Sequence, residues 1–256
     1  MGKYCKIQCL GLTKVPEKNW IVTAPRFMNR LIYMIGGEGG YIKNGKKIQF
    51  KKNYIYFIPG FADISVYSSY EPLDNRMDHS YANFELLPPV VFNDVIEFDP
   101  TRDPNFFATL TLFKTICDNC VDNQVVNLKK EELNLFKGIV IYLTETIVKS
   151  KDIKYVNDDA ILKALDLMHK NISAGISINS IAKECRLTKD GFIRKFKKHI
   201  GETPYSYLKK LKIHTALNLR DSGFSLEEIA EKCGYADATT LSHAISNASK
   251  AKPYFR

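Results

Sequence analysis

The segment IAKEC at residues 181–185 returns as IAEKC at residues 229–233, at an offset of 48 residues. Further along the chain the similarity continues at an offset of 49, where Phe192 corresponds to Leu241. Each copy reads as a short helix, a tight turn and a second helix, which is the pattern of a helix-turn-helix unit. The additional residue falls where Gly234 lies, between the two matched blocks. The sequence therefore predicts two such units.

Helix-capping residues indicate where the helices of this region begin. Thr188 precedes the second helix of the first unit, and Asp237 precedes that of the second unit. Such side chains accept hydrogen bonds from backbone N–H groups that lack a partner within the helix. Ser225 begins the Ser-x-x-Glu pattern of a capping box, and Pro204 opens a long helix that extends to about residue 220. We therefore expect an all-α region in which this long helix joins the two units.

Positive charge is concentrated in the same region. The chain has 256 residues, of which 45% are hydrophobic and 25% charged, and these are ordinary values for a globular protein. Residues 1–159 carry 20 Lys/Arg and 19 Asp/Glu, whereas residues 160–256 carry 17 and 9, so most of the net charge of +9 belongs to the second part. A basic domain joined to a near-neutral one indicates a polyanionic partner.

The first hundred or so residues read as short strands separated by turns. The run from Arg30 to Ile35 is rich in aliphatic and aromatic residues, Asn44-Gly45 is a tight-turn signal, and a later strand ends at Pro59. Short strands with turn signals at regular spacing predict an antiparallel barrel or sandwich.

The pattern changes to a helical one over residues 106–149. Apolar residues recur three or four positions apart in two stripes. The stripes are Phe106, Leu110, Phe113 and Ile116, then Leu133, Phe136, Val140, Leu143 and Ile147. They can cover the sheet, contact a second subunit or do both, and the pattern leaves these alternatives open. A polar link over residues 149–154 separates an N-terminal domain, expected over 1–150, from a C-terminal domain over 156–256.

The sequence shows neither a secretory signal nor an apolar run close to the ~18 residues of a spanning helix. We therefore expect a cytoplasmic protein without a membrane partner, in which the six cysteines are thiols. Cys117 and Cys120 form a CxxC pair, which can sense redox state or contribute to a zinc site. The pair Cys5 and Cys9 lies far away in sequence, so the role of the CxxC pair is left open.

Residues from about 160 onwards resemble the DNA-binding domain of the AraC/XylS family of bacterial transcription regulators. The residues that match in order and spacing are Ile181, Ala182, Thr188, Phe192, Arg194, Phe196, Lys197, Lys198, Gly201, Pro204, Tyr207, Ala216, Leu219, Ile229, Ala230, Gly234, Tyr235, Asp237, Leu241, Pro253 and Arg256. More loosely, the N-terminal part is similar to the cupin-like sensor domain of this family. The resemblance implies an α+β chain of two domains. The first is a cupin-like antiparallel β-barrel with flanking helices, and the second is an all-α domain of two helix-turn-helix units joined by a long helix.

In this family the second helix of each unit enters the major groove, where side chains near its N-terminal end meet base edges. The base-contacting positions implied by the resemblance are Asp190, Ile193, Arg194, Ala238, Thr239, Thr240 and His243. The phosphate-contacting positions are Thr188, Lys189, Lys195, Lys197, Lys198 and Lys250. For Phe192, Phe196, Leu241 and Ile245 we expect packing inside the units. Arg194 can donate two hydrogen bonds to guanine, and Asp190 can accept one from cytosine.

The second unit departs from the family pattern. Ile245 occupies a position that is usually aromatic, Ser246 and Asn247 occupy usually basic positions, and Lys250 replaces a glycine. The last helix therefore has fewer cationic groups than its counterpart in the first unit. We expect it to hold DNA phosphates less strongly.

The resemblance also implies the partners of the protein. The joining helix is roughly 25 Å long at ~1.5 Å per residue, which suits helices that enter successive major grooves ~34 Å apart. The partners expected are double-stranded DNA, RNA polymerase, a small-molecule effector and a second copy of the chain in a homodimer. Dimerisation is expected through the helices of residues 106–149, and activation of transcription is expected rather than repression.

A barrel of this size can hold a small ligand. The candidate lining residues are Trp20, Arg26, Tyr33, Tyr56, Tyr81 and Phe84, with Arg30 as the alternative to Arg26. An arginine would suit an acidic ligand and stacked aromatic rings a sugar, and the sequence does not choose between them. The alternative hypothesis is an N-terminal domain that only oligomerises and binds no effector.

A cupin-type metalloenzyme is the rival interpretation from another class. Metal sites in such barrels need clustered histidines, whereas His79 is the only histidine before residue 160. The remaining histidines are His169, His199, His214 and His243, all in the basic domain. No Ser-His-Asp or Cys-His spacing typical of nucleophilic catalysis is apparent. We therefore predict no enzymatic activity, no cofactor and no bound metal.

Overall fold

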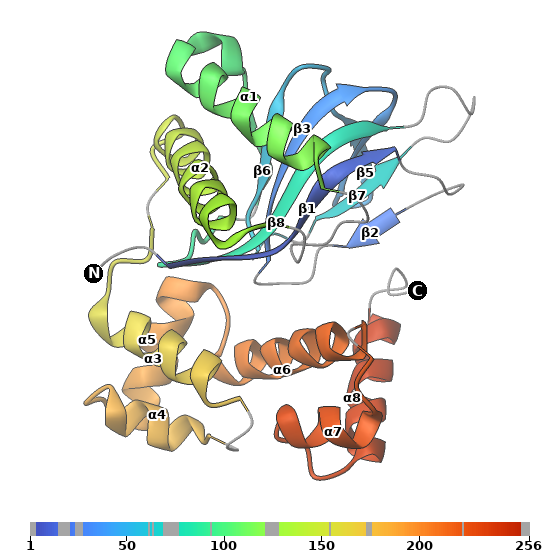
Figure 1. Cartoon of the computed structure of the whole chain (residues 1–256). Helices are drawn as coiled ribbons and strands as arrows, with labels where there is room; N and C mark the ends of the chain where they lie inside the picture. The colour runs from blue at the N-terminus through green and yellow to red at the C-terminus, as the bar shows by residue number, and fades with distance from the viewer. Residues whose placement is uncertain are drawn as a thin grey trace. The chain divides into compact units, whose positions relative to one another are not determined.

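The computed structural model divides into two compact units, Met1–Tyr155 and Val156–Arg256 (Figure 1). The structure describes residues 4–14, 21–23, 28–60, 62, 64–68, 77–92, 94–120, 128–153, 155–172, 176–221 and 223–251. Within these ranges the first unit combines strands with helices, and the second unit is helical.

Two antiparallel sheets form the framework of the N-terminal unit. The strands are β1 (Tyr4–Lys14), β2 (Ile21–Thr23), β3 (Asn29–Gly36), β4 (Gly39–Lys43), β5 (Lys46–Gln49), β6 (Ile55–Ile58), β7 (Ser65–Ser68), β8 (Asp78–Leu87) and β9 (Ile96–Phe98). In the described part of the chain the larger sheet has the order β1-β8-β3-β6-β9 and the smaller one the order β2-β7-β4-β5. The pairings between these strands are antiparallel, as predicted.

The central strands of the larger sheet are buried on both faces. Successive side chains of a strand point to opposite faces. Leu31 of β3 and Phe57 of β6 therefore lie in one apolar core, which we call the helix-side core. Ile32 and Tyr56, their neighbours in the same strands, lie with Val66 of the smaller sheet in a second one, the inter-sheet core.

Helices α1 (Pro104–Asp118) and α2 (Lys130–Lys149) cover the helix-side core (Figure 1). A short 3-10 helix, η2 (Pro100–Arg102), leads into α1, and the Asp103 carboxylate accepts hydrogen bonds from the first N–H groups of α1. The rings of Phe113 and Phe136 lie 5.4 Å apart between the two helices. Burial of each such side chain contributes about 1.5–3 kcal/mol. The buried positions of the two apolar stripes confirm that they cover the sheet.

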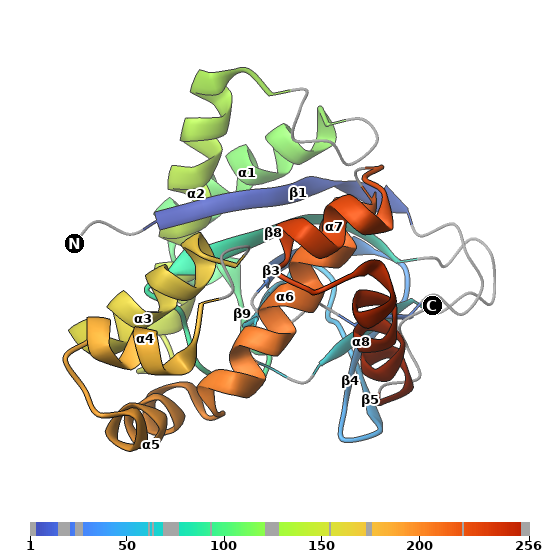
Figure 2. The ribbon, with the colours of Figure 1, turned by 90° about the horizontal axis from the view of Figure 1, so that it is seen from below.

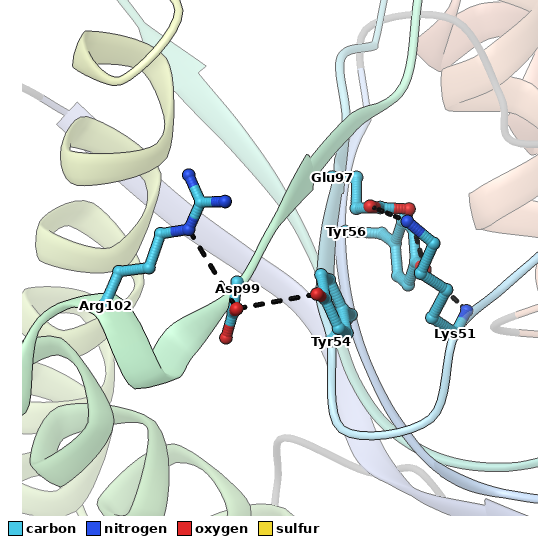
Figure 3. Close-up of polar contacts among 6 residues, drawn as sticks. All are labelled: Lys51, Tyr54, Tyr56, Glu97, Asp99 and Arg102. Atoms are coloured by element: carbon cyan, nitrogen blue, oxygen red, sulfur yellow. Dashed lines mark hydrogen bonds and ion pairs between the residues drawn. The ribbon is translucent and has the colours of Figure 1, made fainter.

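Polar contacts around β6 tie β9 and the start of η2 to the sheet (Figure 3). The Tyr56 hydroxyl accepts a hydrogen bond from the Lys51 backbone N–H at 2.6 Å and donates one to the Glu97 carboxylate at 3.2 Å. The Lys51 ammonium pairs with the other oxygen of Glu97 at 2.6 Å. The Tyr54 hydroxyl lies 3.5 Å from the carboxylate of Asp99, the residue that caps η2. These contacts fix the point from which the chain enters α1.

The C-terminal unit is a set of helices on either side of one long helix (Figures 1 and 2). The helices are α3 (Asp159–Lys170), α4 (Ile178–Glu184), α5 (Lys189–Ile200), α6 (Pro204–Asp221), α7 (Leu226–Lys232) and α8 (Ala238–Ala251). Helix α6 contacts α5 on one side and both α7 and α8 on the other. The predicted helical domain with two units joined by a long helix is confirmed.

We expect Gly40→Ala to destabilise the N-terminal unit. A Cβ at Gly40 would lie 2.0 Å from the Ile48 carbonyl oxygen and 2.9 Å from the Gln49 Cα, so β4 and β5 would have to separate. The expected loss of unfolding free energy is about 1–3 kcal/mol, measured as a lower thermal midpoint by circular dichroism. Gly36→Ala is the matched control, because a Cβ at Gly36 meets no atom within 4 Å. Equal midpoints for the two variants would contradict this expectation.

Candidate nucleic-acid interface

The first helix-turn-helix unit consists of α4, a short turn and α5. Arg186 follows the end of α4 in a left-handed conformation, with φ of 57°. Its N–H bonds to the Lys183 carbonyl at 2.9 Å, and the Leu187 N–H bonds to the Ala182 carbonyl at 2.9 Å. This is a Schellman-type helix end, which closes α4 and turns the chain into α5.

The second unit repeats this turn in α7 and α8. Gly234 has φ of 63°, its N–H bonds to the Glu231 carbonyl at 3.0 Å, and the Tyr235 N–H bonds to the Ala230 carbonyl at 2.8 Å. Gly234 is therefore the equivalent of Arg186. The additional residue of the second copy is Ala236, between Tyr235 and the cap Asp237. This corrects the expectation that Gly234 itself is the insertion.

Capping side chains begin the second helix of each unit as predicted. The Thr188 hydroxyl oxygen accepts a hydrogen bond from the Gly191 N–H at 3.2 Å. In the second unit the Asp237 carboxylate accepts one from the Thr240 N–H at 2.6 Å, and hydrogen bonding from Thr240 lowers the pKa of Asp237. Because Thr188 uses its oxygen as the acceptor, its O–H remains a donor that can bond to a phosphate.

Apolar side chains fix both second helices from behind. Phe192 and Phe196 are fully buried, and the Phe196 ring makes an edge contact with Tyr207 of α6 at 5.4 Å between centroids. In the second unit Leu241 is fully buried and Ile245 is partly buried against the same small core. The expectation that these residues pack the units is confirmed.

The predicted base-contacting residues lie mostly on exposed surface of α5 and α8. Asp190 and Arg194 are exposed, four residues apart on α5, and Ile193 is half-buried. On α8 the exposed residues of the set are Thr239, Thr240 and His243, and Ala238 is half-buried. Each helix thus presents a polar face away from its buried apolar face.

The predicted phosphate contacts divide into free and paired groups. Those exposed on and next to α5 are Thr188, Lys189, Lys197 and Lys198. In contrast, the Lys195 ammonium lies 2.9 Å from the carboxylate of Asp158, which caps α3. Lys195 therefore joins α5 to α3 in this structure. Lys250 belongs to α8, but its side chain lies outside the described part of the structure.

The predicted ligand-lining residues do not converge on one site. Tyr33 and Phe84 face the helix-side core, whereas Tyr56 and Tyr81 face the inter-sheet core, on the other side of the larger sheet. Alternation along the strands separates the two pairs, so the four rings cannot surround a single ligand. Trp20 and Arg26 lie outside the described residues.

A buried polar cluster faces the inter-sheet side instead, and Arg30 is its charged member. Arg30 is 7% exposed, and its Nε donates to the Asn83 side-chain oxygen at 2.6 Å. The Asn83 amide in turn donates to the Cys9 sulfur at 2.9 Å. Among the described residues no carboxylate forms an ion pair with Arg30. The register that pairs Arg30 with Asn83 across β3 and β8 brings this cluster together.

His79 lies on the same face of β8. It is 4% exposed, and its Nδ1 has no hydrogen-bond partner among the residues that the structure describes. Burial, assisted by the positive charge of Arg30, lowers its pKa to about 3, so the imidazole is neutral. Alternation along β3 and β8 could have shown from the sequence that these polar side chains share a face with buried apolar ones. The sequence does not show that β3 pairs with β8, which brings the polar side chains together.

The cysteines show no reactive or metal-binding environment in the described structure. Cys117 and Cys120 are both buried, and burial raises the pKa of each thiol. Thiols held in the neutral form are poor nucleophiles and poor metal ligands. Within the described residues no group of three or more His, Cys, Asp or Glu side chains could hold a metal ion. The helices described here also include none that is long and apolar enough to cross a membrane.

Comparison with known proteins identifies the region that holds both units. Residues 175–253 match the family described as a helix-turn-helix domain. The xylose operon regulatory protein of Escherichia coli K12 is 26% identical over 109 residues, which make up 42% of this chain and 28% of that protein. The chain therefore matches less than a third of that relative's length. YbfI of Bacillus subtilis, an uncharacterized HTH-type transcriptional regulator, is 20% identical over 216 residues, 79% of this chain and 77% of that protein.

Solved structures of ToxT from Vibrio cholerae share the fold. One has a TM-score of 0.60 at 13% identity and covers 99% of this chain and 97% of ToxT. Another, with an unsaturated fatty acid bound to ToxT, has a TM-score of 0.59 at 11% identity and covers 96% of this chain and 91% of ToxT. At these identities the likeness shows the fold alone. The fold so shown is the predicted one, with antiparallel sheets followed by a helical domain.

Proposed function

Because residues 175–253 belong to the AraC/XylS type of helix-turn-helix domain, we propose that this protein is a sequence-specific DNA-binding transcription regulator. It activates its target genes in the cytoplasm, and an effector bound by the N-terminal unit controls it. The domains are 1–150 for sensing and 156–256 for DNA binding. Its relatives are named as regulators, and it acts by binding and not as an enzyme.

The observation that carries this proposal is the exposed polar face of α5. Arg194 and Asp190 lie one helical turn apart, next to Lys197 and Lys198, and all four side chains are exposed. Arg194 can bond to guanine and the lysines to phosphates on either side of the groove. Helix α6, with 18 residues, is roughly 27 Å long. We call each helix-turn-helix unit a reading head. Helix α6 holds the second reading head, which contacts bases through Thr239, Thr240 and His243.

The two heads contribute unequally. Exposed cationic side chains surround the reading face of α5, whereas α8 offers hydroxyl groups and His243 among its described side chains. Phosphate contacts supply most of the salt-dependent binding free energy. The first head therefore contributes most of the affinity for DNA, and the second adds sequence discrimination. RNA polymerase is the expected partner of the bound activator.

We expect selection from a random DNA library with the full-length protein to yield a motif of two short boxes about one helical turn apart. Arg194→Ala should cost about 1–3 kcal/mol and relax one base position in the first box. Lys197→Ala is the matched control on the same helix, and it should weaken binding to all sequences alike and lower the salt slope. Equal losses of Arg194→Ala on selected and random DNA would refute a base contact, and no enrichment by the wild type would refute the function.

The inter-sheet cluster supports an acidic effector rather than a sugar. Among the described residues the buried Arg30 guanidinium has no carboxylate partner, and burial of an unpaired guanidinium is unfavourable because its desolvation is not offset. A carboxylate ligand would supply two charge-assisted hydrogen bonds to Arg30. Sugar stacking is less well supported, because Tyr33 and Phe84 face away from Tyr56 and Tyr81. In ToxT the ligand of one solved structure is itself an acid, an unsaturated fatty acid.

We expect short-, medium- or long-chain fatty carboxylates to raise the thermal midpoint of the wild-type protein, and the matching alcohols to leave it unchanged. Saturating ligand at a hundredfold excess over Kd stabilises by about 2.7 kcal/mol. Arg30→Met should abolish the shift, whereas the exposed Arg102→Met should retain it. A shift that survives Arg30→Met would refute this site. No shift with any carboxylate would favour a sensing unit that only oligomerises.

Outward-facing apolar residues on the helices of the N-terminal unit support a homodimer. Leu112 on α1 and Leu135 on α2 are 51% and 54% exposed, and Phe107 and Tyr142 are exposed on the same two helices. Apolar side chains exposed on two helices that pack against each other favour association.

We expect Leu135→Asp to shift the protein from dimer to monomer in sedimentation at fixed concentration. The buried carboxylate would be left unpaired in the interface, which costs several kcal/mol. Leu226→Asp is the control, because Leu226 is similarly exposed but belongs to α7. A wild-type protein that sediments as a monomer at high concentration would exclude the dimer.

A further inference from the structure

Helix α6 contacts the first helix-turn-helix unit with one of its faces and the second unit with another. Tyr207 is buried against Phe196 of the first unit. Lys212 follows five residues later, about 140° further around the helix at 3.6 residues per turn, and it contacts the turn of the second unit. Ala216, one turn beyond Lys212, belongs to the core of the second unit. The orientation of the second head therefore depends on contacts along this second face.

On the α6 side, the apolar part of this second contact consists of Ala216 and the partly buried Leu219. They pack with Ile229, Ala230, Cys233 and Leu241 of the second unit, whereas α6 contacts the first unit through the rings of Phe196 and Tyr207. Aromatic rings fit one another in few geometries. The contact of α6 with the second unit has no such pair of rings, and Ala216 contributes only a methyl group to it. A directional contact therefore constrains the angle between the helices further.

Lys212 makes such a contact. Its ammonium donates a hydrogen bond to the Gly234 carbonyl at 2.8 Å and lies 5.4 Å from the centroid of the Tyr235 ring. The side chain is half-buried, and burial lowers its pKa. Gly234 and Tyr235 are the two residues that turn the chain from α7 towards α8. Among the described residues no side chain donates a hydrogen bond to the Arg186 or Leu187 carbonyl in the first unit. There the Lys163 ammonium, from α3 and not from α6, donates to the Glu184 carbonyl at the end of α4.

We propose that Lys212 is the positioning residue of the second reading head: its contact with the Gly234 carbonyl and the Tyr235 ring fixes the angle of α7 and α8 on α6, and thereby the spacing of the two DNA boxes. The inference rests on the proposed function. One inserted base pair moves a box by 3.4 Å along the DNA axis and turns it by about 34°, since B-DNA has about 10.5 base pairs per turn. A head held at a fixed angle rejects that displacement, and a head free to tilt tolerates it.

The test measures binding of the full-length protein to a series of operators that differ only in the spacing between the selected boxes. For the wild type, one inserted or deleted base pair should weaken binding about tenfold, the cost of one badly placed base contact. Lys212→Met keeps the alkyl stem and removes the ammonium. It should bind the three spacings within about threefold of one another and bind a one-box operator like the wild type. Lys212→Arg retains a donor and a cation and should restore the spacing preference.

Lys209→Met is the matched control, because Lys209 is an exposed lysine on the same helix. If Lys209 or Lys212 contacted only phosphates, its loss would weaken all spacings equally and lower the salt slope. The proposal would be overturned if Lys212→Met discriminated between the spacings as strongly as the wild type does. It would also be overturned if the variant lost the same amount of binding affinity at every spacing. If Lys212→Met lacks a cooperative thermal transition, Lys212→Gln decides the same comparison. A wild type that selects no two-box motif would instead overturn the proposed function.

Discussion

One helix, α6, carries both helix-turn-helix units, and the arrangement of the C-terminal unit depends on the contacts that α6 makes on two of its faces. Tyr207 on one face contacts the aromatic ring of Phe196, and Ala216 on another belongs to a core that includes Ile229 and Leu241. An 18-residue helix is stiff over its length because each backbone bond supports the next. Any motion of one head relative to the other must therefore occur at these side-chain contacts and not within the helix.

The two heads share a backbone design and differ in chemistry. The left-handed turn residue is Arg186 in the first and Gly234 in the second, with φ of 57° and 63°. A residue with a Cβ is strained in this region by about 1–2 kcal/mol, whereas glycine adopts it freely. The first unit offsets this cost with larger buried side chains, and it also carries the cationic groups of α5. Packing and surface charge therefore favour the first unit, whereas turn geometry favours the second.

In the N-terminal unit the larger sheet is buried on both faces. The positively charged Arg30 on this sheet is therefore buried and not exposed to solvent. Arg30 shares its face of β3 with Ile32 and Met34, so its guanidinium lies among apolar and aromatic side chains. The neutral His79 imidazole lies on the same face. Among the described residues Arg30 has no anionic partner, and burial of an unpaired cation lowers stability. A bound anion would therefore stabilise this cluster.

The sequence by itself determined the helices of the C-terminal unit, because their signals are local. A cap such as Thr188 and a buried position such as Phe192 act within one or two helical turns, and the duplicated segment shows that both units obey the same rules. Only the tertiary structure decided features that join distant residues. The partner of Lys195 is Asp158, from another helix, and the place of the inserted residue depends on hydrogen bonds back to the preceding helix.

The same distinction holds for the sheets. Alternation along a strand shows that neighbours such as Tyr56 and Phe57 face opposite sides. It does not show which side the helices cover, because that depends on strand pairing and on contacts between segments far apart in sequence. The predicted ligand residues were therefore divided between two cores, and the register of β3 with β8 brought Arg30 to Asn83 instead.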